Sequence, residues 1–210
     1  PVYRSAEFDS DINRAFNIFF GMDDIEQVRS CFDDCAADKF PHVLMGNGAC
    51  NSAVDSTYAP TNGHSAFWWP FAPYAVDGDQ DNWDRQKDDY MERVLGVWRE
   101  YASNLDDGNV RAKLLFTPLD IERHDRNMYG GDWMVGEYTG DQALENRPFP
   151  GWGNYRTPIH GLYLCGSSCH PGGNITGAPG YNAARVIAES LGIKPWWKPL
   201  DFKTHLERLR

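Results

Sequence analysis

The sequence predicts a mixed α/β protein, on the strength of three patterns within its 210 residues. Apolar residues recur at helical spacing over 22–37 and again over 83–102. The aromatic stretch 65–71 has the composition of a strand and contains a proline, a residue that stops pairing in a sheet. A short apolar strand, a glycine-rich loop and a helix follow one another over 161–191. Together these patterns predict helices packed on a sheet, followed by a strand–loop–helix element.

Two helices are predicted near the N-terminus. The first ends at Gly21 and carries apolar residues close to helical spacing, at Ile12, Phe16, Phe19 and Phe20. The second, over 22–37, begins with acidic residues, which the positive end of a helix dipole favours. Its apolar stripe consists of Ile25, Val28, Phe32 and Cys35.

Short strands are predicted beyond Pro41. We expect a strand over 42–45, a turn over 46–48 and the aromatic strand over 65–71. A further strand is expected over 110–116, where the residues alternate.

Two more helices are predicted among these strands. The helix over 83–102 has an apolar stripe formed by Met91, Val94, Leu95, Trp98 and Tyr101. Thr117 is a favoured N-cap residue, and Pro118 suits the first helical position. They predict a short helix that ends at about Arg126.

Composition excludes two classes of partner. The net charge is −10, and the 20 Lys and Arg residues do not gather into the basic face that a nucleic-acid duplex requires. No run approaches the roughly 20 apolar residues of an integral membrane segment.

Five irregularly spaced cysteines predict a reducing compartment, the cytoplasm, with peripheral membrane association left open. Because residues 1–4 contain neither Met nor an apolar leader, we expect the chain to be trimmed or to begin within a longer protein.

Two groups resemble incomplete metal sites. Cys31 and Cys35 lie one helical turn apart, but no partner motif supplies further ligands. Four aspartates occupy ligand positions of a calcium-loop template in which Asn82 replaces the required glycine: Asp77, Asp79, Asp81 and Asp88. We expect no metal site and interpret the aspartates as a solvated acidic approach to the following helix.

The segment over 161–191 carries the strongest sign of ligand binding. Its loop contains five glycines, at Gly166, Gly172, Gly173, Gly177 and Gly180. Glycine lets a backbone approach a flat ligand closely, and a helix start offers free N–H groups and a positive dipole end. Connections of this kind usually take about 2–6 residues, so the length favours a ligand over a simple tight connection.

Motifs between residues 147 and 184 carry a family resemblance. They are Arg147-Pro148, Tyr155-Arg156-Thr157-Pro158, Gly161 to Gly166, His170-Pro171-Gly172-Gly173, and Gly177-x-x-Gly180-x-Asn182-Ala183-Ala184. In this order they resemble the C-terminal signature of the phytoene desaturase-like FAD-dependent oxidoreductases, in the branch of pyridine nucleotide-disulfide oxidoreductase domain-containing protein 2. The resemblance extends upstream through residues 117–123 and the helix over 83–102 to Gly63-His64 and the segment from Asp55 to Pro60, so it covers roughly the whole chain.

The resemblance implies an FAD site and a division of the chain by role. Residues 1–145 would form a substrate domain with a mixed sheet and helices. Residues 146–191 would supply the last strand, loop and helix of a Rossmann-like FAD domain, and 192–210 a docking arm. The implied cofactor-binding residues are Gly166, Ser167, His170, Pro171, Gly172, Gly173, Asn174, Thr176, Gly177 and Gly180. His170 is a candidate proton relay or a structural hydrogen bonder.

The family moves a hydride between an apolar substrate carbon and FAD. The residues predicted to line a substrate cavity, or else to belong to the core, are Phe67, Trp69, Phe71 and Tyr74. Only alternate residues of a strand face one way, so at most half of the aromatic stretch can belong to a cavity.

The family's N-terminal Gly-x-Gly-x-x-Gly unit, which holds the ADP half of FAD, is absent from this sequence. The resemblance therefore implies a separate dinucleotide-binding chain or half as partner, besides an apolar or aromatic small molecule as substrate. The alternative is a non-catalytic binding or assembly subunit of a flavoprotein complex. Asn174 supports that alternative, because the family usually has a third consecutive glycine there.

Overall fold

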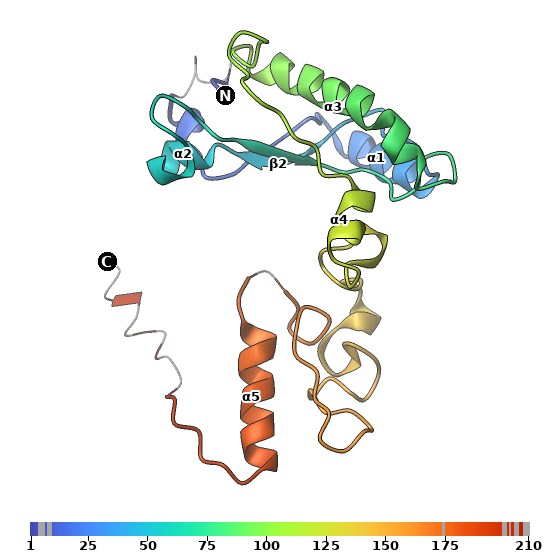
Figure 1. The fold of residues 1–210 in the computed structure, drawn as a ribbon, viewed down its shortest axis with the longest axis vertical. Helices are drawn as coiled ribbons and strands as arrows, with labels where there is room; N and C mark the ends of the chain where they lie inside the picture. The colour runs from blue at the N-terminus through green and yellow to red at the C-terminus, as the bar shows by residue number, and fades with distance from the viewer. Residues whose placement is uncertain are drawn as a thin grey trace. The chain divides into compact units, whose positions relative to one another are not determined.

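The computed structural model describes residues 1–3, 7, 10–173, 175–198, 201, 203, 206 and 207. The chain divides into two compact units, Pro1–Gly131 and Asp132–Arg210, which Figure 1 draws from blue to yellow and from yellow to red. We describe each unit by itself. The boundary predicted after residue 145 lies within the second unit, and the division by role stays a prediction.

The regular elements of the described residues are helices and a small sheet, which confirms the mixed α/β class. The first unit contains η2 (Ser10–Arg14), β1 (Ile18–Phe20), α1 (Ile25–Ala36), β2 (Gly46–Ala49), α2 (Asn51–Val54), η3 (Ser56–Tyr58), β3 (Phe67–Pro70), α3 (Asn82–Tyr101), α4 (Pro118–His124) and η4 (Tyr129–Gly131). The second unit contains η5 (Gly140–Gln142), η6 (Leu144–Asn146) and α5 (Ala178–Ser190).

The sheet of the first unit has the order β1-β2-β3, and both pairs of strands are antiparallel. Its middle strand carries glycine at 46 and 48 because β3 passes very close. A Cβ atom on Gly46 would lie 1.9 Å from the carbonyl oxygen of Trp69. Gly46 lies opposite Phe20 of β1, and Gly48 lies opposite Trp68 of β3. Because neither glycine has a side chain, the rings of Phe20 and Trp68 stack across β2 with their centroids 4.5 Å apart.

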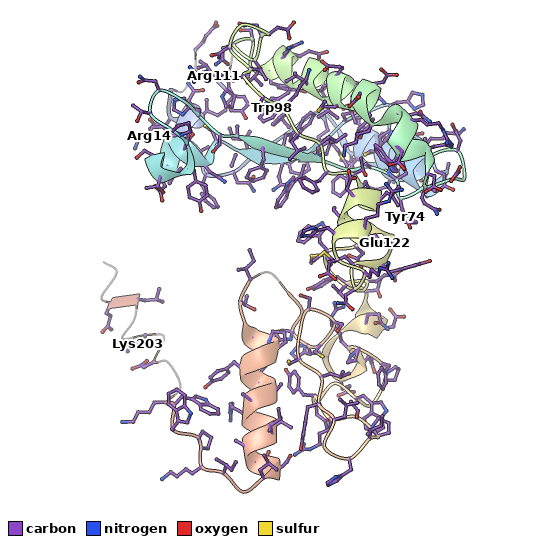
Figure 2. All side chains as sticks on the ribbon, viewed as in Figure 1. Arg14, Tyr74, Trp98, Arg111, Glu122 and Lys203 are labelled. Carbon is purple, nitrogen blue, oxygen red and sulfur yellow. The ribbon has the colours of Figure 1, made fainter. Side chains whose placement is uncertain are left out.

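Helix α3 packs its aromatic residues onto this face of the sheet. Trp98 lies 6.2 Å from Phe20 and 6.0 Å from Trp68, measured between ring centroids. Figure 2 shows the Trp98 side chain between α3 and the sheet. Toward the start of α3, Trp83 and Tyr90 are buried around Phe40. Much of the aromatic surplus is therefore core, where each ring buries a large apolar area.

Helix α4 begins with a complete capping box. The hydroxyl of Thr117 accepts from the backbone N–H of Asp120 at 3.1 Å, and the Asp120 carboxylate accepts from the N–H of Thr117 at 2.9 Å. Partial burial alone would raise the pKa of Asp120, but hydrogen bonds from Lys87 and Thr117 outweigh it and lower that pKa. The sequence prediction of this N-terminus is confirmed.

The predicted helices over 22–37, 83–102 and 117–126 are confirmed as α1, α3 and α4, and the aromatic strand as β3. The helix predicted before Gly21 is wrong. That segment forms η2 and then β1, in which Phe19 is exposed and Phe20 buried, the alternation of a strand.

Two predicted strands are also wrong. Residues 42–45 precede the strand, and the predicted turn over 46–48 lies in β2, because glycine is what the close approach of β3 requires. Residues 110–116 form no strand: Leu115 packs on the core while Leu114 and Phe116 are exposed, so the alternation is real but no neighbouring strand pairs with it.

Adding one methyl group tests the close approach of β2 and β3. We expect Gly46→Ala to lower the free energy of unfolding by about 2–3 kcal/mol, because the two backbones must separate. The matched control is Gly96→Ala within α3, where a Cβ meets nothing within 4 Å. That change should raise stability by about 0.5–1 kcal/mol. Chemical unfolding followed by tryptophan fluorescence measures both, and equal effects would contradict the packing described.

Candidate functional site

A pocket of about 240 Å³ lies in the second unit, between the glycine-rich loop and the start of α5. Most of the residues predicted to bind a cofactor line it: Gly166, Ser167, Gly173, Thr176, Gly177 and Gly180. Cys165, Ile175 and Pro179 complete the lining. His170, Pro171 and Gly172 lie in the loop without lining the pocket, and Asn174 lies outside the described residues.

The start of α5 forms one side of this pocket. Gly177 is the N-cap residue, with a φ of +66° that favours glycine. The hydroxyl of Thr176 accepts from the N–H of Ala178 at 3.2 Å and donates to the carbonyl of Gly173 at 3.2 Å. A Cβ atom on Gly177 or Gly180 would meet nothing within 4 Å. The positive end of a 13-residue helix therefore meets open space bordered by bare backbone.

A buried arginine supports the loop from behind. Arg147 is only 2% exposed, and its guanidinium donates to four backbone carbonyl groups. The distances are 2.7 Å to Glu137, 2.8 and 3.3 Å to Ser167, 3.2 Å to Met134 and 3.3 Å to Val135. Burying a charge is costly unless it is hydrogen-bonded, and these carbonyls accept from all three guanidinium nitrogens.

Tyr138 holds the other side of the loop. Its ring lies under the Arg147 guanidinium, with 4.6 Å between the guanidinium carbon and the ring centroid. Its hydroxyl accepts from the N–H of Gly173 at 3.0 Å. A Cβ on Gly172, whose φ is +96°, would lie 2.0 Å from that hydroxyl oxygen, so only glycine fits there. Arg147 appeared in the sequence only as part of a motif, and Tyr138 carried no sequence signal.

His170 is held in position by a hydrogen bond to its backbone carbonyl. Its carbonyl accepts from the Tyr155 hydroxyl at 2.7 Å, and that hydroxyl accepts from the Asn182 side chain at 2.9 Å. Tyr155 packs with Cys169 and Ala183 in the small core of this unit. A catalytic role for the His170 ring stays a prediction.

The strand predicted over 161–166 is reduced to one bridge between Arg156 and Tyr163. The N–H of Leu164 donates to the carbonyl of Tyr155 at 2.9 Å. A longer strand needs a partner along its whole length, and the described residues of this unit provide one only here.

The residues predicted to contact substrate lie in the first unit. Phe67 and Trp69 share one face of β3, with ring centroids 4.8 Å apart, and Phe71 lies 4.8 Å from Phe32 of α1. This face is the one opposite the buried Trp68, and Trp69 is 56% exposed. The alternation predicted for the aromatic stretch is present.

Tyr74 lies apart from that face, beside Glu122, as Figure 2 shows. A hydrogen bond to Glu122, followed by burial, raises the pKa of Tyr74 to about 12. Glu122 also accepts from the N–H of Gly130 at 2.7 Å. These contacts tie the tyrosine hydroxyl to the end of α4.

The described residues contain no cluster of three or more His, Cys, Asp or Glu arranged to hold a metal ion. Two aspartates of the calcium template instead face arginines, Asp79 at 3.4 Å from Arg85 and Asp81 at 3.6 Å from Arg123. In the part of the chain that is described, no helix is both long and apolar enough to cross a membrane.

The predicted docking arm over 192–210 is described through residue 198 and at four later positions. Trp196 is 90% exposed and lies 5.8 Å from Trp197 between ring centroids. Its role as a docking arm stays a prediction.

Curated proteins align with most of this chain. A limonene dehydrogenase subunit of Castellaniella defragrans is 30% identical over 208 residues, 96% of this chain and 37% of that protein. Pyridine nucleotide-disulfide oxidoreductase domain-containing protein 2 is 37% identical over 176 residues in Mus musculus, 83% of this chain and 30% of that protein. The Rattus norvegicus protein of the same name is also 37% identical, over 177 residues. No family model and no solved structure matches the chain.

The chain spans about a third of the length of these relatives. Their names and their similarity to most of the chain support an oxidoreductase family.

The cysteines should differ sharply in reactivity, with the pocket thiol fastest. Cys165 is exposed, whereas burial raises the pKa of Cys169 and raises that of Cys35 to about 12. Because the thiolate is the nucleophile, iodoacetamide at neutral pH should alkylate Cys165 well before the other two. Peptide mass spectrometry over a time course measures each rate. Alkylation of Cys169 or Cys35 as fast as Cys165 would contradict this arrangement of the loop and of α1.

Proposed function

We propose that this chain is the C-terminal half or subunit of a phytoene desaturase-like, FAD-dependent oxidoreductase, which moves a hydride between an apolar or aromatic substrate and FAD. The observation that carries the proposal is the pocket between bare loop backbone and the N-terminus of α5. The oxidoreductase relatives support it, and the word subunit in one of their names supports a multi-chain dehydrogenase.

The lining fits part of a flavin rather than a whole dinucleotide. Open space at Gly177 and Gly180 lets a flat ring reach the backbone, which a side chain at either position would prevent. Ligand pockets usually enclose about 300–1,000 Å³, and this one encloses about 240 Å³. Other residues must therefore hold the remainder of FAD, and we assign them to a separate dinucleotide-binding chain or half.

The residues of the pocket act by binding and by charge. When bound, FAD supplies the acceptor for the two electrons of a hydride. The positive end of α5 stabilises negative charge at the pocket, and Thr176 holds the loop against the first turn of that helix. We place Gly166, Ser167, Gly173 and Gly177 against the ring. The rest of the proposed cofactor-binding set is His170, Pro171, Gly172, Asn174, Thr176 and Gly180.

An apolar substrate is supported by the exposed aromatic face of β3. Trp69 and Phe71 present rings to solvent beside the half-buried Phe67, and covering such a surface with an apolar molecule is favourable. Tyr74, which lies apart from this face and is hydrogen-bonded to Glu122, is the remaining residue that we propose to contact the substrate. All five cysteines are free, which supports the cytoplasm as the compartment.

Filling the pocket without disturbing the fold tests the flavin site. Gly180 lies in α5 with an ordinary φ and no neighbour for a Cβ, so Gly180→Leu should keep or raise the unfolding temperature. Because Gly180 lines the pocket, the leucine side chain should occupy the ring position. We expect the protein, isolated with the chains that accompany it, to lose most of its bound FAD, measured from absorbance and from cofactor released on denaturation.

Gly140→Leu is the matched control. Gly140 is also in the second unit with open space around it, but it does not line the pocket. It should leave the FAD content unchanged. Undiminished FAD in the Gly180→Leu protein, or no flavin in the unaltered protein, would overturn the proposal.

A further inference from the structure

We infer that Arg147 and Tyr138 are a pair of positioning residues that fix the two walls of the pocket, at Ser167 and at Gly173. The inference rests on the proposed function only for the identity of the ligand. Neither side chain lines the pocket, so both act through the loop.

Arg147 fixes the wall at Ser167. Two of its nitrogens, Nη2 and Nε, donate to the Ser167 carbonyl, so one edge of the planar guanidinium holds that carbonyl oxygen with two hydrogen bonds. Nη2 also donates to the carbonyls of Met134 and Val135, and Nη1 donates to that of Glu137. The arginine thereby connects the pocket loop to a second segment of the same unit.

Tyr138 fixes the wall at Gly173. Its hydroxyl holds the N–H of Gly173, and the same oxygen fills the space that a side chain on Gly172 would need. The two walls also lie close together. A Cβ on Gly173 would lie 2.9 Å from the Ser167 hydroxyl oxygen.

The two positioning residues depend on each other. Tyr138 is 50% exposed, and the guanidinium 4.6 Å from its ring centroid is what orients the ring. Lysine has no planar fork and cannot reproduce the paired bonds to Ser167. Changing either residue should therefore release the loop.

Arg147 also adds charge beside the pocket. Every acceptor that the described residues provide for it is an uncharged carbonyl, so its positive charge is spread over dipoles rather than cancelled by a carboxylate. Because this charge is buried, its electrostatic interactions are screened less than they would be in water. It adds to the positive end of α5, and both favour a ligand that becomes anionic on reduction.

Alkylation of the buried Cys169 measures release of the loop. Cys169 is 1% exposed and lies between Ser167 and Gly173 in the sequence, and its backbone N–H donates to the carbonyl of Gly166 at 3.0 Å. In the full chain we expect Tyr138→Phe and Arg147→Lys each to raise the rate of Cys169 alkylation by iodoacetamide several-fold. Hydrogen–deuterium exchange of peptides from the first unit should be the same in both variants as in the unaltered chain. Arg185→Lys, exposed on α5, and Tyr58→Phe, exposed in the first unit, are the controls and should leave the rate unchanged.

A second measurement separates positioning for the ligand from general stability. In the assembled protein, both variants should bind FAD more weakly, and Arg147→Lys should make the flavin midpoint potential more negative as the loop and the charge move. Tyr138→Phe keeps the charge and should change the potential less.

Unchanged Cys169 alkylation in Tyr138→Phe would overturn the inference, even if Arg147→Lys fails to fold. Faster alkylation with unaltered FAD affinity would also overturn it, because the pair would then hold the loop without serving the ligand. If the unaltered protein contains no flavin while alkylation of Cys169 still rises in both variants, the proposed function is wrong. The inference that Arg147 and Tyr138 hold the pocket walls would then remain valid.

Discussion

Close approach of backbone to its neighbours, at positions where no side chain fits, is the constraint on which both units depend. In the first unit, glycine at 46 and 48 lets β3 pass against β2 and lets Phe20 and Trp68 stack across the middle strand. In the second unit, glycine at 172 makes room for the Tyr138 hydroxyl. The aromatic core and the pocket loop are thus built by the same means.

The net charge of the whole chain and the charge beside the pocket differ in sign. The chain as a whole is acidic, and much of that charge lies on exposed aspartates and glutamates. Beside the pocket, the local field has the opposite sign, since a buried guanidinium and the positive end of α5 both lie there. An acidic protein with a locally positive pocket is suited to a single anionic group inside that pocket rather than to polyanions on its surface.

Local signals explain what the sequence could predict. The helices α1 and α3, the Thr117 cap and the long glycine-rich loop are each specified by residues near one another, and the structure contains all four. The apolar stripe predicted for α1 is wrong in part, because Ile25 and Phe32 are exposed and the buried residue of that helix is Cys31. The strands were harder, because pairing depends on partners far away in the sequence. Glycines 46 and 48 resemble a turn until the approach of β3 is known. Residues 110–116 alternate like a strand but have no partner strand. Tyr138 supports the site through one hydroxyl and one ring face, and no motif marks such a residue.

The central claim is that the loop over 165–177 and the first turn of α5 bind the flavin ring. Hydrogen–deuterium exchange of the assembled protein, measured with FAD bound and after its removal, tests this directly at the level of single peptides. The claim predicts slower exchange with FAD in peptides covering the loop and the start of α5. It predicts little change in α3, whose amides lie in the other unit. Protection confined to other peptides, with the loop exchanging at the same rate in both states, would contradict it.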